Sequence, residues 1–462
     1  MLRTIIAIAA AKIIINISRR FGNQGTVLAG RVARWLDPGI LKKLAARVTG
    51  EVIIITGTNG KTTTSNMIAQ ILGANGNSVV HNQAGANMLN GITTAFIAAS
   101  SLKASRHWDY ALLETDEANV APLLNEVNAG QLLITNFFRD QLDRYGELDR
   151  TIRLISEGVR GRDIRLWLNA DDPLMSALPR DTGLPCSYYG FAATAYDHEA
   201  QQDSREGRYC MLCGEEIEYR RFHFAQLGAY RCPHCGNSNP APDYLGSDLQ
   251  LGHEIVMKVN DIEVNSPYQG FYNAYNILAA VAITKGMGIA DAVIKEAIAR
   301  FQPQAGRMER FTVGIKEATL ILVKNPTGFD QSLQALLNDR RPKNLFLALN
   351  DNAADGRDIS WIWDAELEPL SSAEAELCML VCSGLRSGDM AVRLKYAGVA
   401  TDLIQIESDL DSGIQKALGG PGKVSYILST YTALFKCRKI LLRLQGDPAP
   451  SAIPGERIYG KS

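Results

Sequence analysis

The stretch with the clearest chemical meaning is VIIITGTNGKTTT at residues 52–64. Four apolar residues suited to a buried strand precede a glycine-containing turn, and a helical pattern starts at Lys61 and Thr62. The N–H groups of such a turn and the helix dipole attract phosphate, Lys61 reaches the β- and γ-phosphates, and Thr62 holds Mg²⁺. The stretch predicts a nucleotide–Mg²⁺ site. Ile55 stands where the strict motif has its first glycine, and a glycine turn without a ligand is the alternative.

Four cysteines predict a metal site. They form two Cys-x-x-Cys pairs separated by 18 residues, at Cys210, Cys213, Cys232 and Cys235. This spacing is typical of a tetrahedral Zn²⁺ site on two knuckles. Four thiolates leave no open coordination position, so we predict structural rather than catalytic zinc. The alternative is four unrelated buried thiols.

Alternating strand and helix patterns from residue 51 onward predict an α/β fold with a parallel sheet. The predicted strands end in polar residues, namely Glu114, Asn136, Asp171 and Asp172. The carboxyl ends of parallel strands are where an open sheet binds its ligand. We therefore expect the site at this edge of the sheet.

A length of 462 residues predicts two or three domains. We expect a helical segment at 1–50, an ATP-binding domain at 51–310 with a ribbon inserted at about 205–240, a smaller α/β domain at 311–446, and a flexible tail at 447–462. The net charge of −1 argues against a nucleic-acid binder. Eight cysteines are too few for a disulfide scaffold at this length, and four of them form Cys-x-x-Cys pairs, which favours metal binding in a reducing compartment.

The apolar run at residues 5–17 is interrupted by Lys12 and is shorter than the roughly 20 residues that span a bilayer. We expect a packed N-terminal helix. The alternative is a helix lying at a membrane surface. A signal peptide is not expected, because no small-residue cleavage site clearly follows.

Several of these motifs together resemble the Mur ligase family. They are TGTNGKT at 56–62, the Thr-Asn pair at 135–136 continuing to Asp143, Gly-x-x-Asn-x-x-Asn at 270–276, and Gly306-Arg307. The resemblance implies a Mur-ligase-type P-loop domain followed by a smaller Rossmann-like domain. It implies an ATP site built from Thr58, Asn59, Gly60, Lys61, Thr62, Thr63, Asn273, Asn276 and Arg307.

Within this implied site, Lys61, Glu114 and Arg307 are expected to be catalytic. Glu114 is expected to hold Mg²⁺ with Thr62, since hard oxygen ligands suit this ion; a solvated strand-end carboxylate is the alternative. Its neighbours Thr115, Asp116 and Glu117 are further candidates. Asn273 and Asn276 could instead cap a helix, and Arg307 could form a plain salt bridge.

The four-cysteine ribbon and the run NDNAADGRDISWIWD at 350–364 resemble the amidating branch of the family. The resemblance implies ATP-dependent amidation of the α-carboxylate of D-glutamate in lipid II, or in its precursor, through an acyl phosphate and ammonia. The place implied is the cytoplasm, with possible peripheral contact at the inner face of the membrane. Trp361 and Trp363 are expected on an extended piece, in the core or facing a partner.

The same resemblance implies a partner that makes ammonia, since we find no glutaminase in this sequence. That partner is a GatD-like glutamine amidotransferase subunit, in a heterodimer. Asp355 is expected to complete the partner's catalytic triad by orienting its His. Asp351 and Asp358 are the runners-up, and an ordinary Asx turn is the alternative for Asp355.

Two departures from the family leave the number of Mg²⁺ ions open. Gln141 replaces a His, and residues 144–160 contain no lysine, with arginines including Arg150, Arg153 and Arg160 in their place. Two other functions compete. One is a Mur-like amino-acid or folate ligase that acts without a partner. The other is a zinc-ribbon NTPase acting on nucleic acid, disfavoured by the lack of a basic stripe with interleaved aromatic residues.

Overall fold

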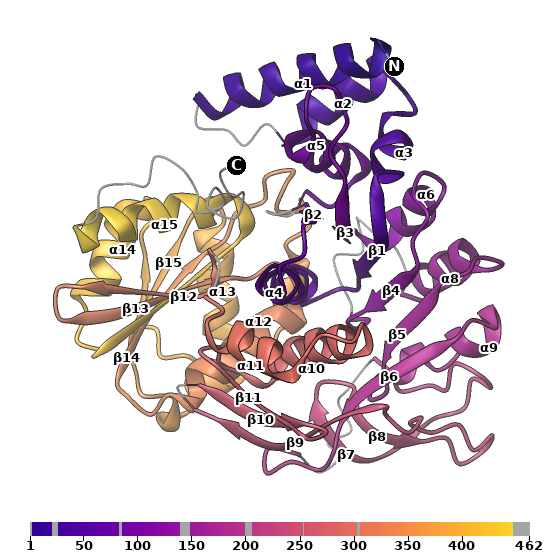
Figure 1. Ribbon diagram of the computed structural model, residues 1–462. Coiled ribbons are helices and arrows are strands. Elements are labelled where there is room, and N and C mark those ends of the chain that lie inside the picture. Colours follow the sequence, from indigo (N-terminus) through magenta and orange to yellow (C-terminus); the bar gives the residue numbers. More distant parts are fainter. Residues whose placement is uncertain are drawn as a thin grey trace. The chain divides into compact units, whose positions relative to one another are not determined.

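The computed structural model (Figure 1) describes residues 2–20, 26–82, 86–138, 148–198, 206–252, 254–302 and 305–446. These residues form two compact units. The first contains the described residues up to 301 except 268–270, and the second contains 268–270 and 302–446. Within the described residues, no helix has the length and apolar character needed to cross a lipid bilayer.

The first unit is built on a mixed sheet with the strand order β11-β10-β9-β6-β5-β4-β1-β3-β2. The strands are β1 (Val48–Thr56), β2 (Val79–His81), β3 (Trp108–Glu114), β4 (Gln131–Ile134), β5 (Arg165–Asn169), β6 (Cys186–Phe191), β9 (Tyr244–Leu251), β10 (Ile255–Val259) and β11 (Ile262–Ser266). Every neighbouring pair in this order from β9 through β6, β5, β4, β1 and β3 to β2 is parallel, while β10 and β11 are antiparallel. β1 lies between β3 and β4, so the polar residues after all three strands share one edge.

Helices cover both faces of this sheet. The helices on one face are α1 (Leu2–Arg20), α2 (Thr26–Leu36), α3 (Ile40–Ala45), α5 (Leu89–Ala99), α6 (Val120–Leu124), α8 (Leu148–Val159) and α9 (Leu178–Thr182). They share a core with Val52 and Ile54 of β1, whose side chains point the same way because side chains alternate along a strand. The other face carries α4 (Lys61–Ala74), α10 (Phe271–Gly286) and α11 (Asp291–Ala299), which pack on one another.

The ribbon is an insertion between β6 and β9. Its two knuckles flank an antiparallel hairpin made of β7 (Glu218–Phe224) and β8 (Leu227–Arg231). Cys210, Ile217, Tyr230 and Cys232 form a small core of their own. The predicted ribbon inserted in an α/β domain is therefore confirmed.

The second unit has the strand order β12-β13-β17-β14-β15-β16. The strands are β12 (Arg307–Val313), β13 (Lys316–Leu322), β14 (Lys343–Ala348), β15 (Leu377–Ser383), β16 (Ile404–Ile406) and β17 (Val424–Ser429). All pairs except β12–β13 are parallel. The helices that pack on the sheet are α12 (Pro326–Asn338), α13 (Ser387–Tyr396), α14 (Leu410–Gly419) and α15 (Tyr431–Gln445). The predicted Rossmann-like α/β fold is confirmed here too.

The prediction of an extended piece around Trp361 and Trp363 is wrong. Residues Ser360–Trp363 form a short 3₁₀ helix, η3. Trp361 is buried and packs edge-on against Phe329. Trp363 is exposed and contacts the Tyr396 ring and the Arg393 guanidinium. In a strand, side chains two residues apart point to the same face, whereas in a 3₁₀ helix they point in different directions. One indole therefore lies in the core and the other at the surface.

Candidate functional site

The loop between β1 and α4 depends on two glycines. Gly57 and Gly60 have φ angles of 121° and 84°, in the left-handed region that favours glycine. A Cβ on Gly57 would lie 2.3 Å from Oγ1 of Thr135, and a Cβ on Gly60 would lie 2.0 Å from Oδ1 of Asn276. Neighbouring elements therefore approach this loop too closely for any larger residue.

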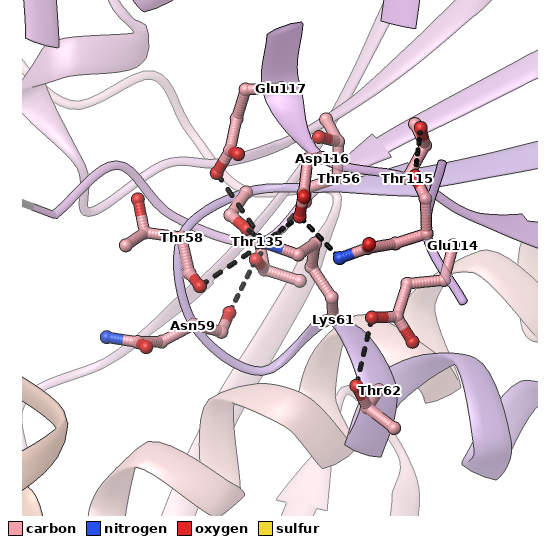
Figure 2. A network of polar contacts seen from close by, with 12 residues as sticks. Thr56, Thr58, Asn59, Lys61, Thr62, Glu114, Thr115, Asp116, Glu117 and Thr135 are labelled. Carbon is pink, nitrogen blue, oxygen red and sulfur yellow. Dashed lines mark hydrogen bonds and ion pairs between the residues drawn. The ribbon is translucent and has the colours of Figure 1, made fainter. Parts of the chain in front are cut away.

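Lys61, the first residue of α4, is buried among oxygen atoms (Figure 2). Its Nζ donates to the Gly57 carbonyl oxygen and lies 3.4 Å from that of Thr58. It also forms ion pairs with Asp116 at 3.6 Å and Glu117 at 3.7 Å. A buried charge is costly unless it is paired, so these two carboxylates compensate the ammonium and hold it across the loop.

Glu114, at the end of β3, turns toward α4 (Figure 2). The Thr62 hydroxyl donates to Oε1 of Glu114 at 3.0 Å. Asn82 fixes the Glu114 backbone through its amide, which accepts from Glu114 N at 2.8 Å and donates to Glu114 O at 2.7 Å. A hydroxyl and a carboxylate side by side are hard oxygen donors of the kind that Mg²⁺ takes. The donor set thus fits this ion. Of the three carboxylates at or after the end of β3, Glu114 lies beside Thr62, and Asp116 and Glu117 lie beside Lys61.

The Thr-Asn pair after β4 clamps the same loop from the other side. Thr135 Oγ1 donates to the Asn59 carbonyl oxygen at 2.7 Å. Asn136 accepts from Asn59 N at 2.9 Å and donates to Asn59 O at 3.0 Å. Phe138 N donates to the Thr58 hydroxyl at 3.0 Å. This pair therefore shapes the loop. Gln141 and Asp143 lie outside the described residues.

Asn273 and Asn276 lie inside α10, not before it. They are therefore not N-caps of that helix, and the capping alternative is wrong. Asn276 Nδ2 donates to Asn273 Oδ1 at 3.1 Å, and Asn276 Oδ1 accepts from Thr64 at 3.3 Å. Both amides are buried beside α4, and the Asn276 amide lies against Gly60. The structure thus brings two residues of the GxxNxxN motif next to the loop, although 212 residues separate Asn276 from Thr64.

The four cysteines converge as predicted. Their sulfur atoms all lie within 4.8 Å of one another. The distance is 3.5 Å from Cys210 to Cys235 and from Cys213 to Cys232, close to the roughly 3.8 Å of a Zn²⁺ tetrahedron with Zn–S bonds of about 2.3 Å. Each knuckle closes with the same N–H to carbonyl bond, from the glycine after the pair to its first cysteine. The cluster fits a structural zinc ion.

The polar residues after β5 are structural supports rather than ligands. Asp172 is buried and accepts from Phe137 N at 2.9 Å and Leu174 N at 3.1 Å. Burial raises its pKa to about 7. Asp171 accepts from Phe191 N at 2.8 Å and from the Tyr275 hydroxyl at 2.9 Å, and burial raises its pKa also. Both side chains stabilise the backbone around the sheet edge.

The ribbon hairpin reaches the segment that clamps the loop. Gln226, between β7 and β8, is buried and donates to the Phe137 carbonyl oxygen at 2.6 Å. Phe224 packs edge-on against Phe138 with ring centroids 6.0 Å apart. A chain of contacts therefore leads from the cysteine ribbon to Phe137 and Phe138, and from Phe138 to Thr58.

Arg307 and Asp355 both belong to the second unit. Arg307 is half-buried and begins β12. Asp355 is buried, and its carboxylate accepts from Thr432 N at 2.7 Å, Thr432 Oγ1 at 2.6 Å and Asn352 N at 3.2 Å. It is thus oriented by α15. Asp351 pairs with Arg386 at 2.7 Å, and Asp358 accepts from Ser360 N at 2.8 Å.

A cavity of about 690 Å³ lies away from all these residues, lined by Glu51, Gln131, Arg165 and Trp167 among others. These side chains belong to the first halves of their strands or to residues just before them, whereas Glu114 and Asn136 lie at the carboxyl ends. This cavity therefore does not contain the predicted site residues. The chemistry gathers at the opposite edge of the sheet.

Sequence reasoning missed three supporting residues, namely Asn82, Asn87 and Gln226. Asn87 Nδ2 donates to Asp116 at 2.5 Å, and so orients a carboxylate that pairs with Lys61. The sequence NQAGANMLNG at 82–91 is rich in Asn and Gly, and this composition could have suggested side chains that bind backbone. Gln226 gave no signal, because its partner is 89 residues away.

Comparisons with known proteins agree on the family. Residues 55–284 match the Mur ligase middle domain, and residues 322–434 match the MurT ligase C-terminal domain. The chain is 39% identical to the lipid II isoglutaminyl synthase (glutamine-hydrolyzing) subunit MurT of Staphylococcus aureus, over 93% of this chain and 95% of that protein. The identity to the subunit of the same name from Streptococcus pneumoniae is 34%, over 96% and 98%. A pseudomurein peptide ligase type C from Methanothermus fervidus has a similar fold, with a TM-score of 0.66, 23% identity, and coverage of 87% of this chain and 80% of that one.

Proposed function

The chain belongs to the MurT family, and from that premise we propose that it is the ATP-dependent synthetase subunit of a lipid II isoglutaminyl synthase. As a carbon–nitrogen ligase, it amidates the α-carboxylate of D-glutamate in the stem peptide to D-isoglutamine. The observation that carries the proposal is the 39% identity to the S. aureus subunit over nearly the full length of both chains. The loop at Gly57–Gly60 with Lys61, Thr62 and Glu114 supplies the matching chemistry.

The reaction has two steps. A carboxylate oxygen of the substrate attacks the γ-phosphorus of ATP, which breaks the bond to ADP and forms an acyl phosphate. Ammonia then attacks the acyl carbon, phosphate leaves with the former carboxylate oxygen, and the nitrogen loses a proton. Positioning and cationic groups dominate catalysis of phosphoryl transfer. Lys61 places its charge at the loop that receives the phosphates, and Arg307 is the second cation that we assign to this step.

We also propose residues for the remaining nucleotide contacts. We assign the β- and γ-phosphates to the backbone of the loop and the start of α4, at Thr58, Asn59, Gly60 and Thr63. Mg²⁺, held by Thr62 and Glu114, neutralises phosphate charge when bound. We assign the adenine ring to Asn273 and Asn276, whose buried amides offer both donors and acceptors beside the loop.

The name of the related subunits implies a partner, and we propose a GatD-like glutaminase that forms a heterodimer with this chain. Asp355 is our candidate for the partner's triad. A triad carboxylate is buried and oriented by hydrogen bonds, and the bonds from Asn352 and Thr432 give Asp355 such a fixed orientation. Tyr431 and Phe435 lie on the same helix as Thr432 and expose large apolar surface, which suits a protein contact.

The test supplies the purified chain with ATP, Mg²⁺, a lipid II-type substrate and one of two nitrogen sources. We expect amide formation with ammonium chloride, and none with glutamine until a GatD-like subunit is added. Incorporation of an amino acid without any partner would instead show a Mur-like or folate-type ligase. ATP hydrolysis that depends on added nucleic acid would contradict both.

A further inference from the structure

Helix α1 is apolar on two opposite sides. One side is buried against α2 and α5 through Ala7, Ile8, Ala11 and Ile15. The other is exposed, with at least half of each side chain accessible at Leu2, Ile6, Ile13 and Ile17. At 3.6 residues per turn, these four positions fall within an arc of roughly 60°. They form a continuous apolar stripe along the outer side of a helix that lies on α2 and α5 (Figure 1).

Helix α2 adds a second exposed apolar surface. Ala29 and Ala33 are buried, and Gly30 packs so closely on α5 that a Cβ would lie 1.8 Å from the Asn90 carbonyl oxygen. The residues on its exposed side are Val27, Leu28, Arg31 and Trp35. The Trp35 side chain is 79% exposed. An indole is amphipathic and is enriched at the boundary between lipid and water.

Residues 1–50, which contain α1, α2 and α3, carry a net positive charge, unlike the chain as a whole. Residues 1–50 contain nine Lys or Arg and one acidic residue, Asp37, whereas the whole chain has 48 basic and 49 acidic residues. Some of these cations are used internally: Arg34 pairs with Glu126, and Lys43 pairs with Asp37. Three exposed ones, Arg31, Lys42 and Arg47, form no ion pair among the described residues.

We propose that the exposed sides of α1 and α2 dock the protein on an anionic lipid surface. The apolar stripe and Trp35 enter the boundary between headgroups and acyl chains, and the exposed basic residues Arg31, Lys42 and Arg47 attract anionic headgroups. Apolar area and electrostatic attraction are the two contributions that bind amphipathic helices at an interface. The benefit of docking rests on the proposed function, because a lipid-linked substrate is held in a bilayer.

The experiment measures co-sedimentation of the full-length chain with vesicles, either phosphatidylcholine alone or mixed with phosphatidylglycerol. We expect binding to the anionic vesicles, weakened when salt screens the charges. The variant Ile6→Ser/Ile13→Ser should bind at least about tenfold more weakly. Arg31→Gln/Lys42→Gln should reduce the preference for anionic over neutral vesicles. Ile315→Ser is the matched control, since Ile315 is 99% exposed but lies in the second unit, and its binding should be unchanged.

Three results would overturn the proposal: no binding to anionic vesicles, equal binding to both kinds, or no loss of binding in Ile6→Ser/Ile13→Ser. A dimer in sedimentation that the same double variant dissociates would also overturn it, by assigning the stripe to a second copy of the chain. Amidation of a short-chain, water-soluble substrate by the same variant should be unchanged. If amidation fails with every variant while vesicle binding follows the expected pattern, only the proposed function falls.

Discussion

At the scale of single residues, we assign a structural role to one buried aspartate, Asp172, and a role in a partner's active site to another, Asp355. Asp172 supports the fold by accepting two backbone N–H groups near the sheet edge. Asp355 is oriented by Thr432 and Asn352, and we assign it to a partner's active site. Both sit in sequence contexts that suggest ligand binding or a turn, and only their surroundings separate the two roles.

We predict that Asp172 makes stability depend on pH. Its folded pKa is raised to about 7 by burial, from an ordinary value of 3.8. The neutral form is therefore favoured in the fold, and the stability that it contributes is lost as pH rises from about 4 to about 7. The free energy of unfolding of Asp172→Asn minus that of the wild type should increase by roughly 2–3 kcal/mol between pH 5 and pH 8. Urea titrations at both pH values check this, and a constant difference would contradict it.

We predict that Asp355→Asn abolishes glutamine-driven amidation in the presence of the partner and leaves ammonium-driven amidation within about threefold. Asparagine keeps an acceptor for Thr432 but lacks the charge that orients and stabilises a partner's imidazolium. Asp358→Asn is the control, since Asp358 is half-buried and accepts from Ser360 N. Loss of both activities in Asp355→Asn would show that this carboxylate serves the fold of the chain instead.

At the scale of elements, the four-cysteine ribbon is linked by side-chain contacts to the loop at Gly57–Gly60. The hairpin β7–β8 places Gln226 on the Phe137 carbonyl oxygen, and Phe138 bonds the Thr58 hydroxyl. The ribbon was predicted as a structural insertion. The ribbon contacts Phe137 and Phe138, and Phe138 N bonds Thr58, so the ribbon also supports the loop at Gly57–Gly60 to which we assign the phosphates of ATP.

We predict that Gln226→Met raises KM for ATP by roughly three- to tenfold with little change in kcat. Methionine fills the same volume but leaves a buried carbonyl oxygen without its donor, which costs about 1–3 kcal/mol. Steady-state kinetics with ammonium chloride measure both constants. Gln415→Met, at an exposed site in α14, is the control. A lower melting temperature with unchanged KM would mean that the bond stabilises the fold alone.

At the scale of the whole molecule, each of the two units has hydrophobic core clusters of its own among the described residues. The first contains the strands around β1 with α1 and α5. The second contains β13, β14 and β17 with α12 to α15. The cysteine cluster belongs to the first unit. We therefore expect a substitution in the core of one unit to lower the melting temperature of that unit.

We predict two transitions in calorimetry of the zinc-loaded chain, and one zinc per chain in metal analysis. Chelation of zinc should lower only the transition of the first unit, because structural zinc contributes folding free energy. Leu347→Ala should lower only the other transition, since truncating a buried leucine costs about 2–5 kcal/mol. A single transition that moves as a whole in both cases, or a preparation without zinc, would contradict the prediction.

The sequence by itself determined the parts of this protein whose geometry is local. The glycine turn before Lys61 and the two Cys-x-x-Cys knuckles are set by backbone conformation over a few residues, and alternating strand and helix patterns report the α/β fold because burial follows local periodicity. The tertiary structure alone decided which distant side chains meet. Asp116 and Glu117 reach Lys61 because β3 lies beside β1, Asn276 touches Gly60 from 216 positions away because α10 packs on α4, and Gln226 reaches Phe137 across 89 positions. Strand order and helix packing determine such contacts, and neither can be predicted from the residue pattern of a short segment.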